Sequence, residues 1–186
     1  MPELPYEIWK DRIENELMNI NKLNVLEENT IIKGETSIEF TINIKALGLI
    51  KNKEELVPQR SHRIFLKINR SFPYPGGIDF SWLTNIFHPN IHPVQTSPGG
   101  SGTGYICLNV LKKWSRLSDL ETTAKALKSL VENPNPDDPL NYPPCLEASE
   151  LFKKKSMADI KEELNITEEK VEEKEEEDED VLIIED

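Results

Sequence analysis

Residues 65–91 read FLKINRSFPYPGGIDFSWLTNIFHPNI, and this stretch combines two strand patterns with a turn between them. Apolar residues recur at every second position on both sides of PYPGG, which is typical of strands with one buried face. They are Ile64, Leu66 and Ile68 before the turn and Ile78, Phe80 and Trp82 after it. Proline and glycine favour a turn at residues 73–77. The stretch therefore predicts two adjacent strands, each with an apolar face.

A third strand precedes this pair. Residues 37–44, SIEFTINI, alternate without error between polar and apolar side chains. Residues 48–61 turn polar and charged, which predicts a loop before the strand at Ile64. Three strands that follow one another with one apolar face each predict an antiparallel β-meander whose apolar face is covered by helices.

Helical spacing precedes and follows the strands. Residues 5–21 form an amphipathic pattern, and a second pattern comes after Ser118, which with Glu121 has the form of a capping box. A further helix is predicted from about Pro144 to Lys155. The apolar positions are Trp9, Ile13, Leu17 and Ile20 in the first helix, and Leu120, Ala124, Leu127 and Val131 in the second. The fold class is therefore α+β, an antiparallel β-meander flanked by an N-terminal helix and C-terminal helices.

The charge divides the 186 residues into two parts. The net charge is -12, and residues 158–186 hold 15 acidic and 3 basic residues, whereas residues 1–157 hold 19 of each. We expect residues 1–157 to form one domain and residues 158–186 an acidic extension, partly helical or disordered. Without a basic face, binding to nucleic acid or to an anionic membrane is not expected.

The sequence contains no pattern typical of a membrane span, a secretory signal or a metal site. No apolar stretch is long enough to span a bilayer, and the start MPELPYEIWKD has no secretory pattern, so we expect a cytoplasmic protein. Its two cysteines, Cys107 and Cys145, are then free thiols. Metal-ligand spacing such as CxxC is absent, and we expect neither a metal nor another cofactor.

Three motifs in order carry the functional signal: NIFHPNI at 85–91, ICLNVLKKW at 106–114 and PNPDDPLN at 134–141. Their combination resembles the ubiquitin-conjugating enzymes, which carry ubiquitin or a ubiquitin-like protein as a thioester on one cysteine. The resemblance covers roughly residues 5–157. It implies a ubiquitin-conjugating-enzyme-like fold and a transferase. Its partners would be a ubiquitin-like modifier, an activating enzyme, a RING-type ligase and the lysines of protein substrates.

Cys107 is the candidate nucleophile. Taken alone, an isolated cysteine is more commonly an inert, half-buried thiol, but the resemblance places Cys107 at the position that carries the modifier. A thiolate is both a good nucleophile and a good leaving group, so it can accept an acyl group and surrender it to an amine.

Asn90 and Asp138 are the other two candidate catalytic residues, both by resemblance. Asn90 would stabilise the oxyanion formed when a lysine attacks the thioester, or hold the cysteine loop in place, or serve only as a turn residue. Asp138 would orient or help deprotonate the lysine; alternatively, Asp137 or Asp138 serves the turn and caps the next helix. Asn109 could add a polar contact near the thioester.

The histidines are assigned no catalytic role. By resemblance, His88 of the HPN segment is a structural hydrogen-bonding residue, because a base beside the thioester would activate water against it. We expect His62 and His92 at the surface or in loops. Cys145 is interpreted as a small core or surface residue, and Trp114 as a packing residue.

Two departures from the family pattern concern loops. Residues 92–104, HPVQTSPGGSGTG, lengthen the segment between Asn90 and Cys107, either as a surface insertion or as a loop that gates the thioester or contacts a modifier. Residues 73–77 and 115–117 differ at the positions that form the ligase-binding surface, which puts binding to a typical ligase in question. The acidic first helix indicates an unusual or co-adapted activating enzyme.

Two alternatives to a transferase remain open at this point: a non-catalytic binding scaffold on the same fold, and a cysteine hydrolase, which requires His88 or His92 within hydrogen-bond reach of Cys107. The acidic end of the chain is also open to two interpretations. The run Val181–Ile184 either adds a strand to the sheet edge of a modifier, or the tail only keeps the protein in solution.

Overall fold

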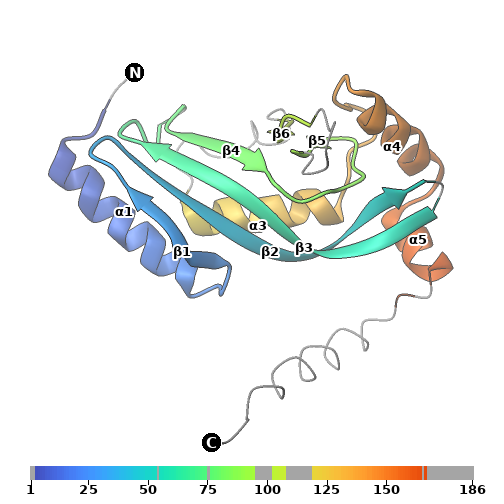
Figure 1. Ribbon diagram of the computed structural model, residues 1–186, viewed down its shortest axis with the longest axis horizontal. Helices are drawn as coiled ribbons and strands as arrows, with labels where there is room; N and C mark the ends of the chain where they lie inside the picture. Colours follow the sequence, from blue (N-terminus) through green and yellow to red (C-terminus); the bar gives the residue numbers. More distant parts are fainter. Residues whose placement is uncertain are drawn as a thin grey trace, which may run out of the picture.

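A computed structural model describes residues 3–53, 55–74, 76–94, 102–107, 119–164 and 166 of the chain. Its main feature is a four-stranded antiparallel sheet in which each strand pairs with the next (Figure 1). The strands are β1 (Leu26–Lys33), β2 (Ser37–Asn52), β3 (Glu55–Asn69) and β4 (Ile78–Trp82). The predicted antiparallel meander is confirmed, with one strand more than expected.

The loop predicted for residues 48–61 is wrong. Strands β2 and β3 continue through this region and pair from Gly48 with Gln59 to Asn52 with Glu55. The register shifts between Lys45 and Gly48, so the alternation seen in residues 37–44 does not carry through. The irregular pattern and the charged residues near the turn together concealed a continuous hairpin.

Strand β1 was not predicted because it lacks a regular alternation. Its exposure changes in steps of two residues, and its pairing with β2 shifts between Glu27 and Ile32. It lies at the edge of the sheet, where half of its backbone groups need no partner strand. The sequence of β1 therefore lacks the alternation of polar and apolar residues that indicates a strand.

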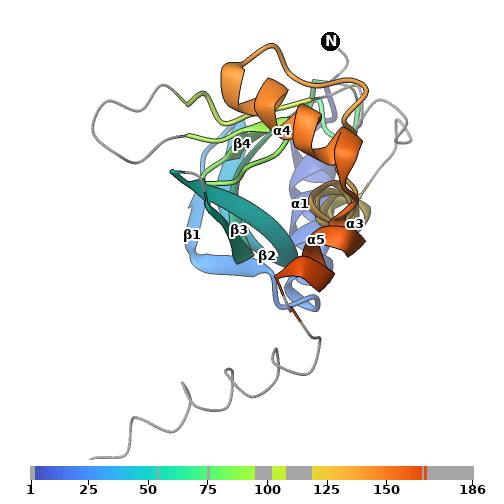
Figure 2. The same cartoon turned by 90° about the vertical axis from the view of Figure 1, so that its right-hand side faces the viewer.

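Three helices agree with the predicted positions: α1 (Tyr6–Asn21), α3 (Leu120–Glu132) and α4 (Pro143–Lys154). Helix α5 (Met157–Glu163) is an additional one, and Figure 2 shows these helices gathered beside the sheet. The N-cap of α3 is Asp119 rather than Ser118, since the Asp119 carboxylate accepts from the Thr122 N–H at 2.6 Å. No helix in the described part of the chain is long and apolar enough to cross a membrane.

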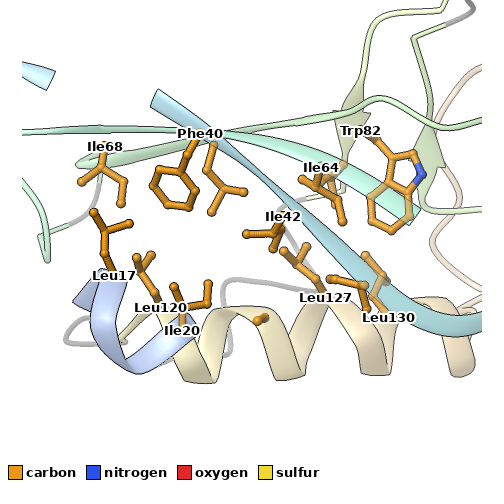
Figure 3. Packing of buried hydrophobic residues seen from close by; sticks show 14 of the residues in the cluster. Leu17, Ile20, Phe40, Ile42, Ile64, Ile68, Trp82, Leu120, Leu127 and Leu130 are labelled. Carbon is orange, nitrogen blue, oxygen red and sulfur yellow. The ribbon is translucent and has the colours of Figure 1, made fainter. Parts of the chain in front are cut away.

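The core lies between the sheet and two helices, α1 and α3 (Figure 3). Side chains of α1 and α3 meet the apolar faces of β2, β3 and β4. Those labelled in Figure 3 are Leu17, Ile20, Phe40, Ile42, Ile64, Ile68, Trp82, Leu120, Leu127 and Leu130. Burying these side chains supplies the main stabilising term of the domain.

The buried carboxylate of Glu16 ties α1 to α3. It accepts from the Leu120 N–H at the start of α3 at 2.8 Å and pairs with Arg12 at 3.1 Å. A negative charge at a helix N-terminus is favourable because the first N–H groups lack helical partners. This contact fixes where α3 begins, and α3 in turn carries the carbonyl that binds His88.

A second cluster buries the far end of the β2–β3 hairpin. Leu49 packs there with Phe87, Ala148 of α4 and Ile160 of α5. Helix α5 therefore continues across residues 157 and 158, where the charge balance changes. The division of the chain into a domain and an extension stays a prediction.

Candidate active site

Two short strands bring the cysteine segment beside the HPN segment. Strand β5 (Ile91–His92) pairs antiparallel with β6 (Tyr105–Ile106), so that Ile91 faces Ile106. The Cys107 N–H donates to the Asn90 carbonyl at 2.8 Å. Cys107 is 6% exposed.

The ends of the insertion at residues 92–104 are held on β4. The Trp82 N–H donates to the Gly104 carbonyl at 2.8 Å, and the Val94 N–H donates to the Trp82 carbonyl at 2.9 Å. Gly104 has a φ of +71°, and a Cβ there would lie 2.7 Å from Ser81 Oγ, so glycine is required. The insertion thus leaves and re-enters the fold at one strand. Residues 95–101 lie outside the described part.

The Asn90 side chain is wholly engaged by the acidic turn. Its Nδ2 group donates to the carbonyls of Asn135 at 3.0 Å and Asp138 at 2.9 Å, and its Oδ1 accepts from the Asn135 N–H at 2.8 Å. Asn90 is fully buried. A primary amide has two N–H hydrogens, and both are used here. The Asn90 side chain therefore binds the acidic turn, while its main-chain carbonyl receives the Cys107 N–H.

Further contacts fix the turn that carries Asp138. The Leu140 N–H donates to the Pro89 carbonyl at 2.9 Å, and Asn135 Oδ1 accepts from the Asp137 N–H at 3.2 Å. The Asp138 residue is exposed while its main-chain carbonyl is bound by Asn90. Neither aspartate caps α4, because the N-cap residue is Tyr142. The helix-cap interpretation of this pair is wrong.

His88 is locked by two backbone groups. Its Nε2 lies 2.9 Å from the Leu130 carbonyl and therefore donates, while its Nδ1 accepts from the Asn90 N–H at 3.0 Å. These bonds define the neutral tautomer. Burial lowers the pKa of His88 to about 3. The ring is thus a structural hydrogen-bonding residue, as its position in the HPN segment predicts.

The surface positions expected for His62 and His92 are wrong. His62 is fully buried on β3, where Nε2 bonds the Ala46 carbonyl at 3.1 Å, and burial lowers its pKa. His92 is 4% exposed, and burial lowers its pKa as well. His92 stacks on Tyr142, with ring centroids 3.9 Å apart and planes at 6°. In both cases the ring is covered by residues far away in sequence.

The geometry that a cysteine hydrolase requires is not found among the described residues. No hydrogen bond there joins Cys107 to His88 or His92: the His88 nitrogens bond backbone groups, and His92 Nδ1 bonds Thr103 Oγ1 at 3.1 Å. Cys145 is a core residue whose S–H donates to the Ile91 carbonyl at 3.4 Å. Burial raises the pKa of the Cys145 thiol to about 11, which leaves it protonated at neutral pH.

Sequence reasoning missed Asn135 and Tyr142. Asn135 contributes backbone groups, which no side-chain motif reveals, although its place in PNPDD is a weak signal. Tyr142 meets His92 only through the fold. The candidates Asn109 and Trp114, residues 115–117 and the tail with Val181–Ile184 lie outside the described residues.

Comparisons with known proteins show what this chain is similar to. Residues 12–164 match the family model described as ubiquitin-conjugating enzyme. Protein PEROXIN-4 of Arabidopsis thaliana is 36% identical over 99 residues, which make up 52% of this chain and 57% of that protein. Ubiquitin-conjugating enzyme E2 2 of Aspergillus fumigatus is 28% identical over 131 residues, 70% of this chain and 66% of that protein.

The match to these two relatives is therefore partial, since this chain spans 57% and 66% of their lengths. Among solved structures, S. cerevisiae Ubc12 aligns over 78% of this chain and 71% of its own, with a TM-score of 0.55 and 23% identity. At this identity the likeness shows the shared fold.

His88 predicts a pH dependence of stability. Below the ordinary pKa of about 6.5, His88 is protonated in the unfolded chain, whereas in the folded protein it stays neutral down to about pH 3. The free energy of unfolding therefore decreases as the pH is lowered. Between pH 7 and pH 5 the loss due to His88 is about 2 kcal/mol. Urea unfolding at pH 7 and pH 5 measures this loss. On going from pH 7 to pH 5, the free energy of unfolding of His88→Gln should decrease less than that of the wild type, by the amount due to His88. Equal losses in the two proteins would contradict this prediction.

Proposed function

Because this chain belongs to the ubiquitin-conjugating enzyme family, we propose that Cys107 accepts ubiquitin or a ubiquitin-like protein as a thioester and transfers it to a lysine. The observation that carries the proposal is the set of hydrogen bonds around Asn90. Through its main chain and its side chain, Asn90 connects the segment of Cys107 with the turn of Asp138. The backbones of the residue that bears the nucleophile and of the residue that bears the carboxylate are thus bound to two sides of Asn90.

The reaction consists of two acyl transfers. The Cys107 thiolate attacks the carbonyl carbon of the thioester on the activating enzyme, a new C–S bond forms, and the thiolate of that enzyme leaves. A lysine amine then attacks the same carbon, the isopeptide C–N bond forms, and the Cys107 thiolate leaves. The amine gives up its proton to solvent or to a nearby carboxylate. No redox step or cofactor is needed.

The neutral, buried His88 supports a carrier rather than a hydrolase. A thioester on Cys107 persists only if water near it is not activated. The two ring nitrogens of His88 are occupied by the Leu130 carbonyl and the Asn90 N–H, so this ring offers no site for a water proton. A long-lived thioester is what a carrier between two proteins requires.

Asp138 is proposed to orient the incoming lysine. A carboxylate at the rim of the site attracts an ammonium and places the amine that forms from it for attack. Asn90 contributes as a positioning residue, because its amide hydrogens hold the turn of Asp138. In this arrangement Asp138 provides the negative charge, and Asn90 holds the turn that carries it.

The partners implied are a ubiquitin-like modifier, an activating enzyme, a RING-type ligase and substrate proteins, and the proposed place of action is the cytoplasm. At the end of PYPGG, a Cβ on Gly77 would lie 2.2 Å from the Phe72 backbone nitrogen. This turn therefore depends on glycine, which favours a ligase adapted to it. A binding scaffold with the same fold is the alternative function and requires no thioester.

The first test is thioester formation on Cys107. With an activating enzyme, ATP and a panel of modifiers, the wild type should give an adduct that a thiol reagent removes, and Cys107→Lys one that resists it. Cys145→Ser is the matched control and should charge as the wild type does, because Cys145 is buried and protonated. If neither the wild type nor Cys107→Lys forms an adduct with any modifier of the panel, the transferase proposal fails in favour of the scaffold.

The second test separates the two neighbouring aspartates. Asp138→Asn keeps the main-chain carbonyl that Asn90 binds and removes the negative charge, so discharge of a preformed thioester onto free lysine should slow by about tenfold. Asp137→Asn is the matched control, since both residues are exposed on the same turn. Charging by the activating enzyme should be unchanged in both. Equal discharge rates in the two variants would rule out the role proposed for Asp138.

A further inference from the structure

His92 contacts both the segment that leads to Cys107 and the N-cap residue of α4. On one side its Nδ1 bonds Thr103 Oγ1 at 3.1 Å, and this hydroxyl also accepts from the Tyr105 N–H at 3.3 Å, two residues before Cys107. On the other side its ring lies flat on Tyr142, with centroids 3.9 Å apart and planes at 6°. One side chain therefore touches both the cysteine segment and the residue that opens α4.

This contact ends a series of bonds between the HPN segment and the acidic turn. The Pro89 carbonyl accepts from Leu140, the Asn90 amide bonds Asn135 and Asp138, and the Ile91 carbonyl accepts from Cys145. The stack of His92 on Tyr142 follows next along the chain. Unlike the others, it is formed by two side chains and can be removed without altering a main-chain bond.

We propose that His92 and Tyr142 act as positioning residues: their stacked rings hold the turn that carries Asp138 at a fixed place relative to Cys107. The inference rests on the proposed function and deepens it, since it concerns the step in which lysine attacks the thioester. It also gives a role to one end of the insertion, because Thr103 holds the edge of the His92 ring.

Physical reasons favour this role over simple filling of space. Tyr142 is only partly buried, so much of its surface is not part of the core. Aromatic rings in contact contribute about 0.5–1.5 kcal/mol beyond the area they bury, and they lose little entropy because each has only two rotatable bonds. Asn90 fixes the first half of the turn, and the stack fixes its end.

A double-mutant cycle tests the proposal. His92→Ala, Tyr142→Ala and the double variant are charged, and discharge onto free lysine is followed over a range of lysine concentrations. Each single variant should lower the maximal discharge rate roughly three- to tenfold, the change expected from loss of one such aromatic contact. The double variant should be no slower than the slower single variant, because the stack is lost once. Charging should change by less than about twofold in each variant.

Two control variants separate stacking from general damage. Tyr142→Phe keeps the ring and should discharge as the wild type does. Leu146→Ala removes an exposed side chain from α4, 42% exposed, and should also have no effect. The proposal is overturned if Tyr142→Ala discharges lysine at the wild-type rate, if Tyr142→Phe is as slow as Tyr142→Ala, or if the two alanine effects multiply in the double variant.

A readout without catalysis keeps this proposal separate from the proposed function. Leu140 lies two residues before Tyr142, and its N–H donates to the Pro89 carbonyl. The hydrogen exchange of this N–H therefore reports how firmly the turn is held. In Tyr142→Ala this exchange should quicken by about tenfold, with unchanged exchange in the central strands β2 and β3. Unchanged exchange at Leu140 would overturn the positioning role. Failure of the wild type to form a thioester would instead overturn the proposed transferase function. The exchange result would still decide whether the stacked rings hold the turn.

Discussion

The fully buried side-chain amide of Asn90 is the interaction on which the rest of the site depends. It bonds the backbone of the acidic turn three times, and the main-chain carbonyl of the same residue receives the Cys107 N–H. A buried amide that loses such partners keeps the full cost of its desolvation, so the turn and the amide hold each other in place. The segment of Cys107 and the turn of Asp138, which are separated in sequence, thereby both bond Asn90. The sheet and α3 support this residue.

The same support explains why His88 is present without acting as a base. Its ring joins the Leu130 carbonyl of α3 to the Asn90 N–H, and thereby transmits the position of the helix to the site. Burial keeps this ring neutral. Helix α3 is itself set by Glu16, which binds its first N–H group. A series of buried polar contacts thus connects α1, α3, His88 and Asn90.

Much of the fold and the family could be predicted because both depend on local sequence patterns. The alternation of polar and apolar residues predicted the meander, the amphipathic spacing predicted the helices, and the order of the three motifs predicted the family. The continuous hairpin at residues 48–61 was missed because a bulge breaks the alternation, and β1 because an edge strand needs no regular pattern. The bonds of Asn90 and the stack of His92 on Tyr142 were invisible because the groups involved meet only in the folded chain.

The central claim is that the Asn90 amide is occupied by the turn rather than available to a reacting carbonyl. The most direct measurement is nuclear magnetic resonance of the Asn90 side-chain NH₂ group in the folded, uncharged protein. Both hydrogens should exchange slowly with water and show couplings across hydrogen bonds to the carbonyl carbons of Asn135 and Asp138. An amide that exchanges as fast as an exposed one, with no such couplings, would contradict the claim and return Asn90 to the role of an oxyanion donor.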